Sequence, residues 1–163
     1  LNKREEIMKY RNLFIFLIGS YLIAGDVTDI KKLLIKHYSL MNSARWNEVV
    51  ANLHSKGTIN GDSNGSFWYS RASTEKAFTR GLSTGEKYDF TPRYINVEVL
   101  ETAPKYPKIA VAYHYLVGSY TIDGIIKNDY RTRVSHVLTT ENGQWKIKLS
   151  DHTPLHSGSG IPN

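Results

Sequence analysis

The chain has 163 residues and contains no cysteine, which excludes disulfide bridges and thiolate metal sites. This absence says little about the compartment, because many exported bacterial proteins also lack disulfides. The formal net charge is +6, yet the basic residues are scattered, with no run of lysine or arginine and no aromatic-basic stripe. We therefore expect a solvated basic surface and no nucleic-acid partner. The length suits one domain that buries its own core.

Motifs for nucleotides, metals and nucleophiles are also missing. The glycines near residues 61–65 lack the lysine and the helix start of a phosphate-binding loop, and no nucleophile or dinucleotide motif is present. The six histidines show neither H-x-H nor H-E-x-x-H spacing, and they include His37, His54, His114, His136 and His152. We expect no metal and no cofactor, which leaves cofactor-free chemistry or plain binding.

The first 25 residues are expected to lie outside the folded domain. Residues 8–25 have a short basic start and about 12 apolar or small residues, the pattern of a signal peptide. Residues 1–7 look like untranslated leader, because Arg-Glu-Glu can be read back as a purine-rich ribosome-binding sequence just before Met8. We expect translation to begin at Met8 and the protein to be periplasmic or secreted.

Cleavage of this signal is expected near Ala24 or Gly25, although Leu22 or Ile23 occupies the position where a small residue is usual. An uncleaved membrane anchor is one alternative, and it would be the only contact with a membrane. A buried helix of the folded domain is another, since no polar face interrupts the run.

Two amphipathic helices open the domain, which we expect over residues 26–156. Thr28 suits an N-cap, and apolar residues follow at helical spacing to about Asn42. A second stripe starts at Trp46, and a third helix is expected from Ser70 or Arg71 to Arg80, with Gly81 ending it. A short strand at residues 58–60 and the segment 67–69 lie between the second and third helices. Residues 157–163 are expected to form a flexible tail.

The rest of the chain alternates as β-strands do, over residues 94–101, 109–121, 130–139 and 144–151. Asn142-Gly143 between the last two runs is the strongest local signal for a hairpin. The order of elements predicts an α+β fold, with three N-terminal helices on one face of a curved antiparallel sheet. We expect a homodimer through the open sheet face, because Leu116, Val134 and Leu138 need more cover than the helices provide.

These residues resemble the nuclear transport factor 2-like superfamily, in its SnoaL-like branch, and the calmodulin-dependent kinase II association domain. The resemblance rests on the segment 64–78, on Arg133-x-Ser135-x-Val137 and on Asn142-Gly143-x-Trp145-x-Ile147 with the closing Asp151-His152-Thr153. It implies a cone-shaped, cystatin-like sheet with a pocket, and it says little about function, because this fold hosts many activities.

The last strand departs from the pattern of this branch, in which a histidine commonly stands six residues after the tryptophan. Here that position is Asp151, and His152 follows it. Either Asp151 replaces the inward histidine, or a bulge turns His152 inward. Since a pocket Asp or His acts as the base in related enzymes, both residues are candidate catalytic groups.

Arg133 and Ser135 share one face of their strand, and Asp151 continues the apolar stripe of Trp145 on the next. If these faces coincide, an arginine and an aspartate are the charged groups on an apolar pocket wall. Arg133 is then a cation for a ligand, and its alternative is an edge arginine paired with Asp129 or Asp151. If Arg133 lies on the outer face, His136 and Thr132 become the expected inward pair. The other expected ligand-binding residues are aromatic, with core packing as their alternative: Tyr38, Trp46, Trp68, Tyr113 and Tyr115.

The sequence thus favours an exported domain that binds a small apolar or anionic ligand without a cofactor. The alternative is a cofactor-independent isomerase or dehydratase, of the SnoaL or ketosteroid isomerase type, that uses a pocket Asp or His as base. An oligomerisation module is a further alternative, for which we expect a filled cone and a large apolar sheet face.

Overall fold

The structure is a computed structural model, and it describes residues 25–100, 103 and 105–155. The expected leader (residues 1–7), the expected tail (157–163) and all of the expected signal peptide except Gly25 lie outside the described residues. None of the helices in the described ranges combines the length and the apolar character needed to cross a membrane.

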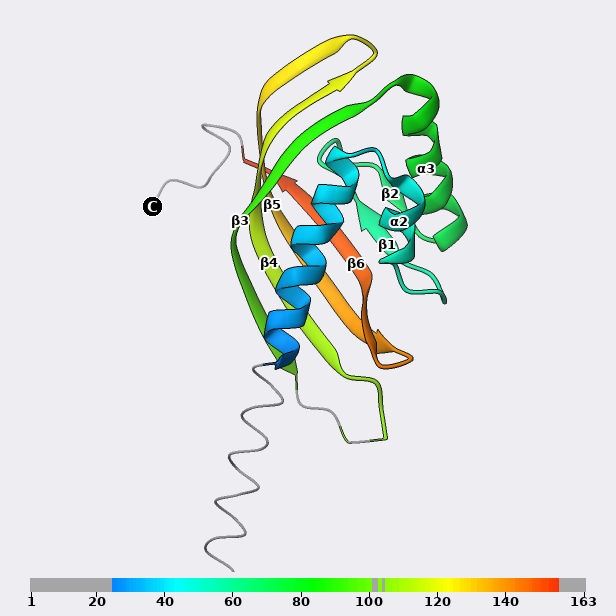
Figure 1. The fold of residues 1–163 in the computed structure, drawn as a ribbon, viewed down its shortest axis with the longest axis vertical. Coiled ribbons are helices and arrows are strands. Elements are labelled where there is room, and N and C mark those ends of the chain that lie inside the picture. Colours follow the sequence, from blue (N-terminus) through cyan, green and yellow to red (C-terminus); the bar gives the residue numbers. More distant parts are fainter. Residues whose placement is uncertain (1–24, 101–102, 104, 156–163) are drawn as a thin grey trace, which may run out of the picture.

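Among the described residues, three helices cover one face of the sheet (Figure 1). The first occupies residues 25–42, so Thr28 lies inside it and the prediction that Thr28 caps it is wrong. Helix α2 spans Trp46–Ala51, and α3 spans Arg71–Thr84. Helix α3 continues past Gly81, because one glycine within a helix costs only about 1 kcal/mol relative to alanine. It ends before Gly85, whose φ of +64° suits a helix terminus.

The strands are β1 (Ile59–Gly61), β2 (Phe67–Trp68), β3 (Lys87–Leu100), β4 (Ile109–Ile122), β5 (Ile125–Glu141) and β6 (Gln144–Pro154). Within the described residues they form one six-stranded sheet in the order β2-β1-β6-β5-β4-β3. Neighbouring strands are antiparallel except β1 and β6, which are parallel. The predicted hairpin turn joins β5 to β6 at Asn142 and Gly143, both with positive φ. The predicted α+β fold is confirmed, and its sheet is curved and unclosed.

Two register irregularities accompany the curvature of the sheet. One lies between β3 and β4, at Arg93 to Asn96, where Tyr94 has a φ of +56°, and the other lies between β4 and β5, just after Gly118. Gly118 must be glycine, since a Cβ there would lie 1.9 Å from the carbonyl oxygen of Asp89. Such bulges increase twist and bend a strand, which here helps the sheet to wrap around the helices.

A third irregularity lies in β6 and exchanges the two faces of that strand. Val137 pairs with Leu149 and Leu138 pairs with Ile147, so Lys148 has no partner on β5. Before this bulge the side chain of Ile147 is buried beneath the helices. After the bulge the alternation shifts by one residue, and Ser150 is the next buried side chain.

The buried interior has two parts. The closed end, near the β5–β6 turn, is a cluster of apolar side chains that includes Ile30, Leu34, Leu138 and Ile147. The open end contains Tyr38, Phe90, Leu116 and Val134, with the partly buried Tyr88, Tyr120 and Tyr130 packed against them. The prediction that Leu116, Val134 and Leu138 need a second sheet is wrong, because each is 0% exposed within this single chain.

Candidate functional site

A cavity of about 820 Å³ lies between the helices and the open end of the sheet. Its apolar wall is mainly aromatic, from Tyr38, Trp46, Trp68, Phe78, Tyr88, Phe90, Tyr120 and Tyr130. Polar side chains also line it, among them His37, Asn60, Ser150 and His152, and the carboxylates of Asp62 and Glu86. Lys76 and Arg80 also line the cavity, but both are exposed on α3, so positive charge lies only at its rim.

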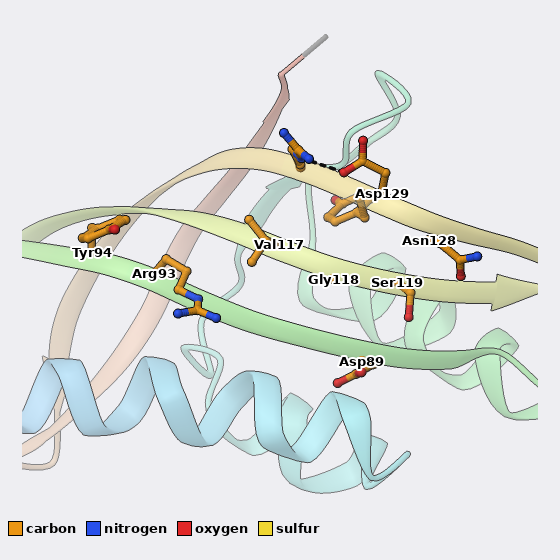
Figure 2. A pocket seen from close by; sticks show the side chains of 10 residues that line it. Asp89, Arg93, Tyr94, Val117, Gly118, Ser119, Asn128 and Asp129 are labelled. Carbon is orange, nitrogen blue, oxygen red and sulfur yellow. Dashed lines mark hydrogen bonds and ion pairs between the residues drawn. The ribbon is translucent and has the colours of Figure 1, made fainter. Parts of the chain in front are cut away.

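A second hollow, of about 690 Å³, lies on the opposite face of the sheet and is shallow and open. Figure 2 shows its polar side chains on β3, β4 and β5, among them Arg93, Tyr94 and Asp129. The Nε atom of Arg131 donates to Asp129 Oδ1 at 2.6 Å, yet both side chains are mostly exposed. Because enclosure from water strengthens polar contacts and raises the apolar area that a ligand buries, we take the helix-covered cavity as the candidate site.

Four histidines from four elements gather at the inner face beside this cavity. His114 on β4 and His136 on β5 are buried, and their Nε2 atoms lie 3.1 Å apart. The Tyr38 hydroxyl lies 3.3 Å from His114 Nε2 and 3.5 Å from His136 Nε2. His136 Nδ1 lies 2.8 Å from Ser150 Oγ, and His114 Nδ1 lies 3.1 Å from the carbonyl oxygen of Tyr115.

Burial keeps these imidazoles neutral. Desolvation lowers the pKa of His136 well below 6.5, nearby histidines lower it further, and the Leu149 carbonyl opposes the shift. Desolvation also lowers the pKa of His114, against a smaller opposing effect of the Tyr115 carbonyl. At neutral pH both rings therefore carry one proton each.

His37 and His152 line the cavity directly. Desolvation, with a smaller effect of His114, lowers the pKa of His37 to about 4, and its Nδ1 lies 3.5 Å from Asn52 Nδ2. The same causes, with a contribution from His37, lower the pKa of His152 to about 3, although its side chain is only partly buried. Within the described ranges, no three carboxylate or histidine side chains are placed to hold a metal ion.

Trp46 contributes the one buried ring donor of the described residues that lacks a hydrogen-bond partner, its Nε1. Its indole is 3% exposed, stacks on Phe78 at 5.7 Å and meets Tyr88 edge-on at 5.6 Å. All three rings line the cavity. Leaving an N–H group without a partner costs free energy, which a ligand acceptor in the cavity would recover.

The structure places some of the predicted site residues at the cavity and others away from it. Tyr38, Trp46, Trp68 and His152 line the cavity. The others lie outside its walls: Arg133, Ser135, Tyr113, Tyr115 and Asp151.

The expectation that Arg133 and Asp151 share a pocket wall is therefore wrong. Arg133 and Ser135 are exposed, because on β5 the alternate residues Thr132, Val134 and His136 face the helices. The bulge at Lys148 decides between the two alternatives for β6, with His152 inward and Asp151 opposite the exposed Ser135. Tyr113 and Tyr115 are 55% and 45% exposed on the outer face.

The sequence did not point to His37, His114 or Ser150 as site residues. It indicated His136, with Thr132, only as the inward pair if Arg133 lay on the outer face, and both of these side chains are buried. A signal for them existed, because His37 interrupts the apolar stripe of the first helix and His136 alternates with Val134 and Leu138. Their proximity could not be read from spacing, since it depends on the pairing of β4, β5 and β6.

The arrangement of helices, sheet and cavity is that of the nuclear transport factor 2-like, or cystatin-like, fold, as the sequence resemblance implied. No protein-family model matches the sequence, and no curated protein matches it.

Solved structures from several bacteria share this fold. A nuclear transport factor 2-like protein of unknown function from Pseudomonas putida superposes with a TM-score of 0.67 at 9% identity, over 83% of this chain and 91% of that chain. A ketosteroid isomerase-like protein from Erwinia carotovora gives 0.64 at 13% identity, over 81% and 98%. A protein with a cystatin-like fold from Caulobacter vibrioides gives 0.60 at 19% identity, over 79% and 89%. At these identities the likeness shows the fold alone.

Proposed function

We propose that the protein binds a small, largely apolar, uncharged molecule in the helix-covered cavity. The observation that carries this proposal is the cavity itself, about 820 Å³ in volume and walled by aromatic rings. Ligand pockets commonly have volumes of 300–1,000 Å³ and apolar walls with a few polar groups. A solid oligomerisation module has no need of such a space, so binding ranks above that alternative.

The charge distribution favours an uncharged ligand over an anion. The imidazoles of His37 and His152 at the cavity wall are neutral at pH 7, and the nearest cations lie at the rim on α3. An anion placed against the inner wall would lose its hydration without gaining a counter-charge, and that loss is costly.

A thermal-shift screen tests this proposal with matched pairs of neutral and acidic steroid-like, polyketide-like and aromatic compounds. Neutral members are expected to raise the unfolding temperature more than their acids. Ala77 lines the cavity, whereas Ala72 is exposed on the same helix, so Ala77→Trp should block binding while Ala72→Trp should preserve it. Arg133→Met should also leave binding unchanged, because its side chain lies on the outer face. Equal binding by the wild type and Ala77→Trp would exclude this cavity.

An isomerase or dehydratase is the second candidate, favoured by the position of His152 on the cavity wall. A base of low pKa accepts protons weakly at neutral pH, and the pKa of His152 is lowered to about 3. For this reason binding ranks first. If His152 is a catalytic base, His152→Gln should abolish turnover of a bound ketone or alcohol while the affinity changes little.

We also propose that two copies pair through the outer face of the sheet. Exposed apolar and aromatic side chains support this on adjacent strands: Leu100 on β3, with Ile109, Val111, Tyr113 and Tyr115 on β4. Light scattering at micromolar concentration should give the mass of a dimer, and Tyr113→Glu with Val111→Glu should give a monomer. A wild-type monomer would contradict this proposal.

Export is the last element of the proposal. Asp26 supports a folded domain that starts close to the expected cleavage point, because its Oδ1 accepts from Trp145 Nε1 at 3.2 Å and its Oδ2 pairs with Lys108 Nζ at 2.6 Å. A gene that begins at Met8 should yield a protein trimmed near Asp26 in the bacterial periplasm. Full-length protein found only in the cytosol would contradict export.

A further inference from the structure

The hydrogen bonds behind the cavity have a fixed direction, which begins at the backbone of β4. The Tyr115 carbonyl oxygen can only accept, so the proton of neutral His114 lies on Nδ1, 3.1 Å away. His114 Nε2 is then bare and acts as an acceptor. The Tyr38 hydroxyl lies 3.3 Å from the same nitrogen and can donate a hydrogen bond to it, so it is compatible with this position of the proton.

His136 continues the chain toward the cavity. Its Nε2 lies 3.1 Å from His114 Nε2, and two bare nitrogens at that separation would repel, so His136 Nε2 carries the proton. His136 Nδ1 is therefore bare. The Leu149 carbonyl near His136 could accept a hydrogen bond from Nδ1–H only in the other neutral form of the ring, in which Nε2 carries no proton. In that form two unprotonated nitrogens would face each other across 3.1 Å.

Ser150 ends the chain at the cavity wall. Its Oγ lies 2.8 Å from the bare His136 Nδ1, so the hydroxyl donates its proton to that nitrogen. The side chain is 6% exposed and lines the cavity. The only side-chain donor of Ser150, its hydroxyl proton, is thus bonded to His136, so Ser150 presents only acceptor lone pairs to the cavity.

We propose that the order Ser150 to His136 to His114 to the Tyr115 carbonyl makes Ser150 Oγ a dedicated hydrogen-bond acceptor, which selects ligands that carry a hydroxyl or N–H group. This inference rests on the proposed binding function and names the chemical class of its ligand as an apolar alcohol, phenol or amine-like N–H donor in its uncharged form. His114 and His136 are positioning residues, since they act on the ligand through Ser150.

The proton order can be measured without any ligand. Long-range nitrogen-proton correlation spectra of the protein labelled with ¹⁵N-histidine distinguish the two neutral forms of each ring. At pH 7.5 we expect His114 with its proton on Nδ1 and His136 with its proton on Nε2. The opposite form of either ring, or a charged pair at this pH, would overturn the order and with it the role of Ser150.

Selectivity is measured with 2-naphthol, which can donate, and 2-methoxynaphthalene, which cannot. The ratio of their dissociation constants is compared between the wild type and Ser150→Ala. Loss of one hydrogen bond should reduce the preference for 2-naphthol by about threefold to tenfold. Ser73 is the matched control, because it also lines the cavity, but its Oγ donates to the Ser70 carbonyl and accepts from both the N–H and the hydroxyl of Ser70, which leaves no lone pair for a ligand. Ser73→Ala should keep the wild-type ratio.

The two measurements separate the failure of this inference from that of the proposed function. If both probes bind and Ser150→Ala retains the wild-type ratio, the acceptor role of Ser150 is wrong while binding stands. If neither probe, nor any neutral compound of the thermal-shift screen, binds the wild type, the binding function is wrong and the selectivity falls with it. The spectra judge the proton order in either case.

Discussion

The two ends of the interior lie between the same helices and the same sheet, but one is tightly packed and the other surrounds a cavity. At the closed end, aliphatic side chains such as Ile30, Leu34, Leu138 and Ile147 are fully buried against one another. At the open end, aromatic rings and neutral histidines surround a cavity of about 820 Å³. Burial there is accompanied by polar groups that need partners, and by one indole N–H that has none.

This difference indicates how stability and binding are divided along the molecule. A packed aliphatic cluster gains free energy from every buried methylene, whereas a cavity forgoes those contacts and gains a place for a ligand. Changes at the closed end should therefore alter the free energy of unfolding, and changes at the open end should alter binding more than stability.

The largest effect is expected at the closed end. Ile147 is 0% exposed, so Ile147→Ala should lower the free energy of unfolding by about 2–5 kcal/mol through lost burial and the void that remains. Urea unfolding followed by circular dichroism measures this change. A loss below about 1 kcal/mol would show that the cluster relaxes, and would remove the contrast between the two ends.

The second largest effect is expected at the open end, where acid should lower the free energy of unfolding. The pKa of His37 is about 4 in the folded state and 6.5 in the unfolded chain. Between these two pH values, the unfolded chain is mostly protonated at His37 and the folded state is not. The free energy of unfolding therefore falls as the pH drops from 6.5 toward 4, by at most about 1.4 kcal/mol per pH unit for each such histidine. His114 and His136 add to this loss with the same sign.

Urea unfolding at pH 7.5, 6.5 and 5.5 measures this slope in a range where most carboxylates stay ionised. His37→Asn should flatten the slope, since asparagine does not titrate. A stability that is unchanged between pH 7.5 and 5.5 would mean that these imidazoles accept protons freely in the folded state.

A smaller effect is expected for Trp46→Phe. The change removes some apolar contact with Phe78, but it also removes a buried donor without a partner, and the two effects oppose each other. The free energy of unfolding should change by less than about 1 kcal/mol. A loss above about 2 kcal/mol would indicate that the indole N–H is paired, for example with an enclosed water molecule.

The smallest effect is expected outside both ends, at the Arg131–Asp129 pair on the outer face. The two side chains are 63% and 75% exposed, and exposed pairs contribute little in water. A double-mutant cycle with Arg131→Ala and Asp129→Ala should give a coupling energy below about 0.5 kcal/mol. A larger value would show that this hollow shields its charges from solvent.

Much of the fold could be predicted from local sequence patterns. The Asn142-Gly143 turn, the apolar stripe of the first helix and the alternation of Val134, His136 and Leu138 were readable, because each depends on a few neighbouring residues. The helix ends were less readable, since Thr28 and Gly81 are tolerated inside helices when tertiary packing extends them.

The candidate site was only half readable for a physical reason. Large aromatic residues such as Tyr38 and Trp46 generally indicate buried surface, and the sequence identified both as ligand-binding residues. The histidine cluster joins residues separated by 76 and 98 positions, as the contacts of Tyr38 with His114 and His136 show. No pattern within one strand indicates such contacts. The error over Asp151 came from assuming unbroken alternation along β6. The error over Arg133 came from assigning Arg133 to the same face as Ile147, whereas Ile147 pairs with Leu138, which lies on the other face of β5.

The bulge at Lys148 makes the inner wall of β6 depend on the register of the strand as well as on its residues. Because Lys148 has no partner on β5, Leu149 lies opposite Val137 and Ser150 lies opposite His136. If Lys148 were instead paired with Val137, every later residue of β6 would shift by one position, and Leu149 and Asp151 would occupy the face that Ser150 and His152 occupy now. A change in register alone would then place a carboxylate where a neutral imidazole now lies, with no residue replaced.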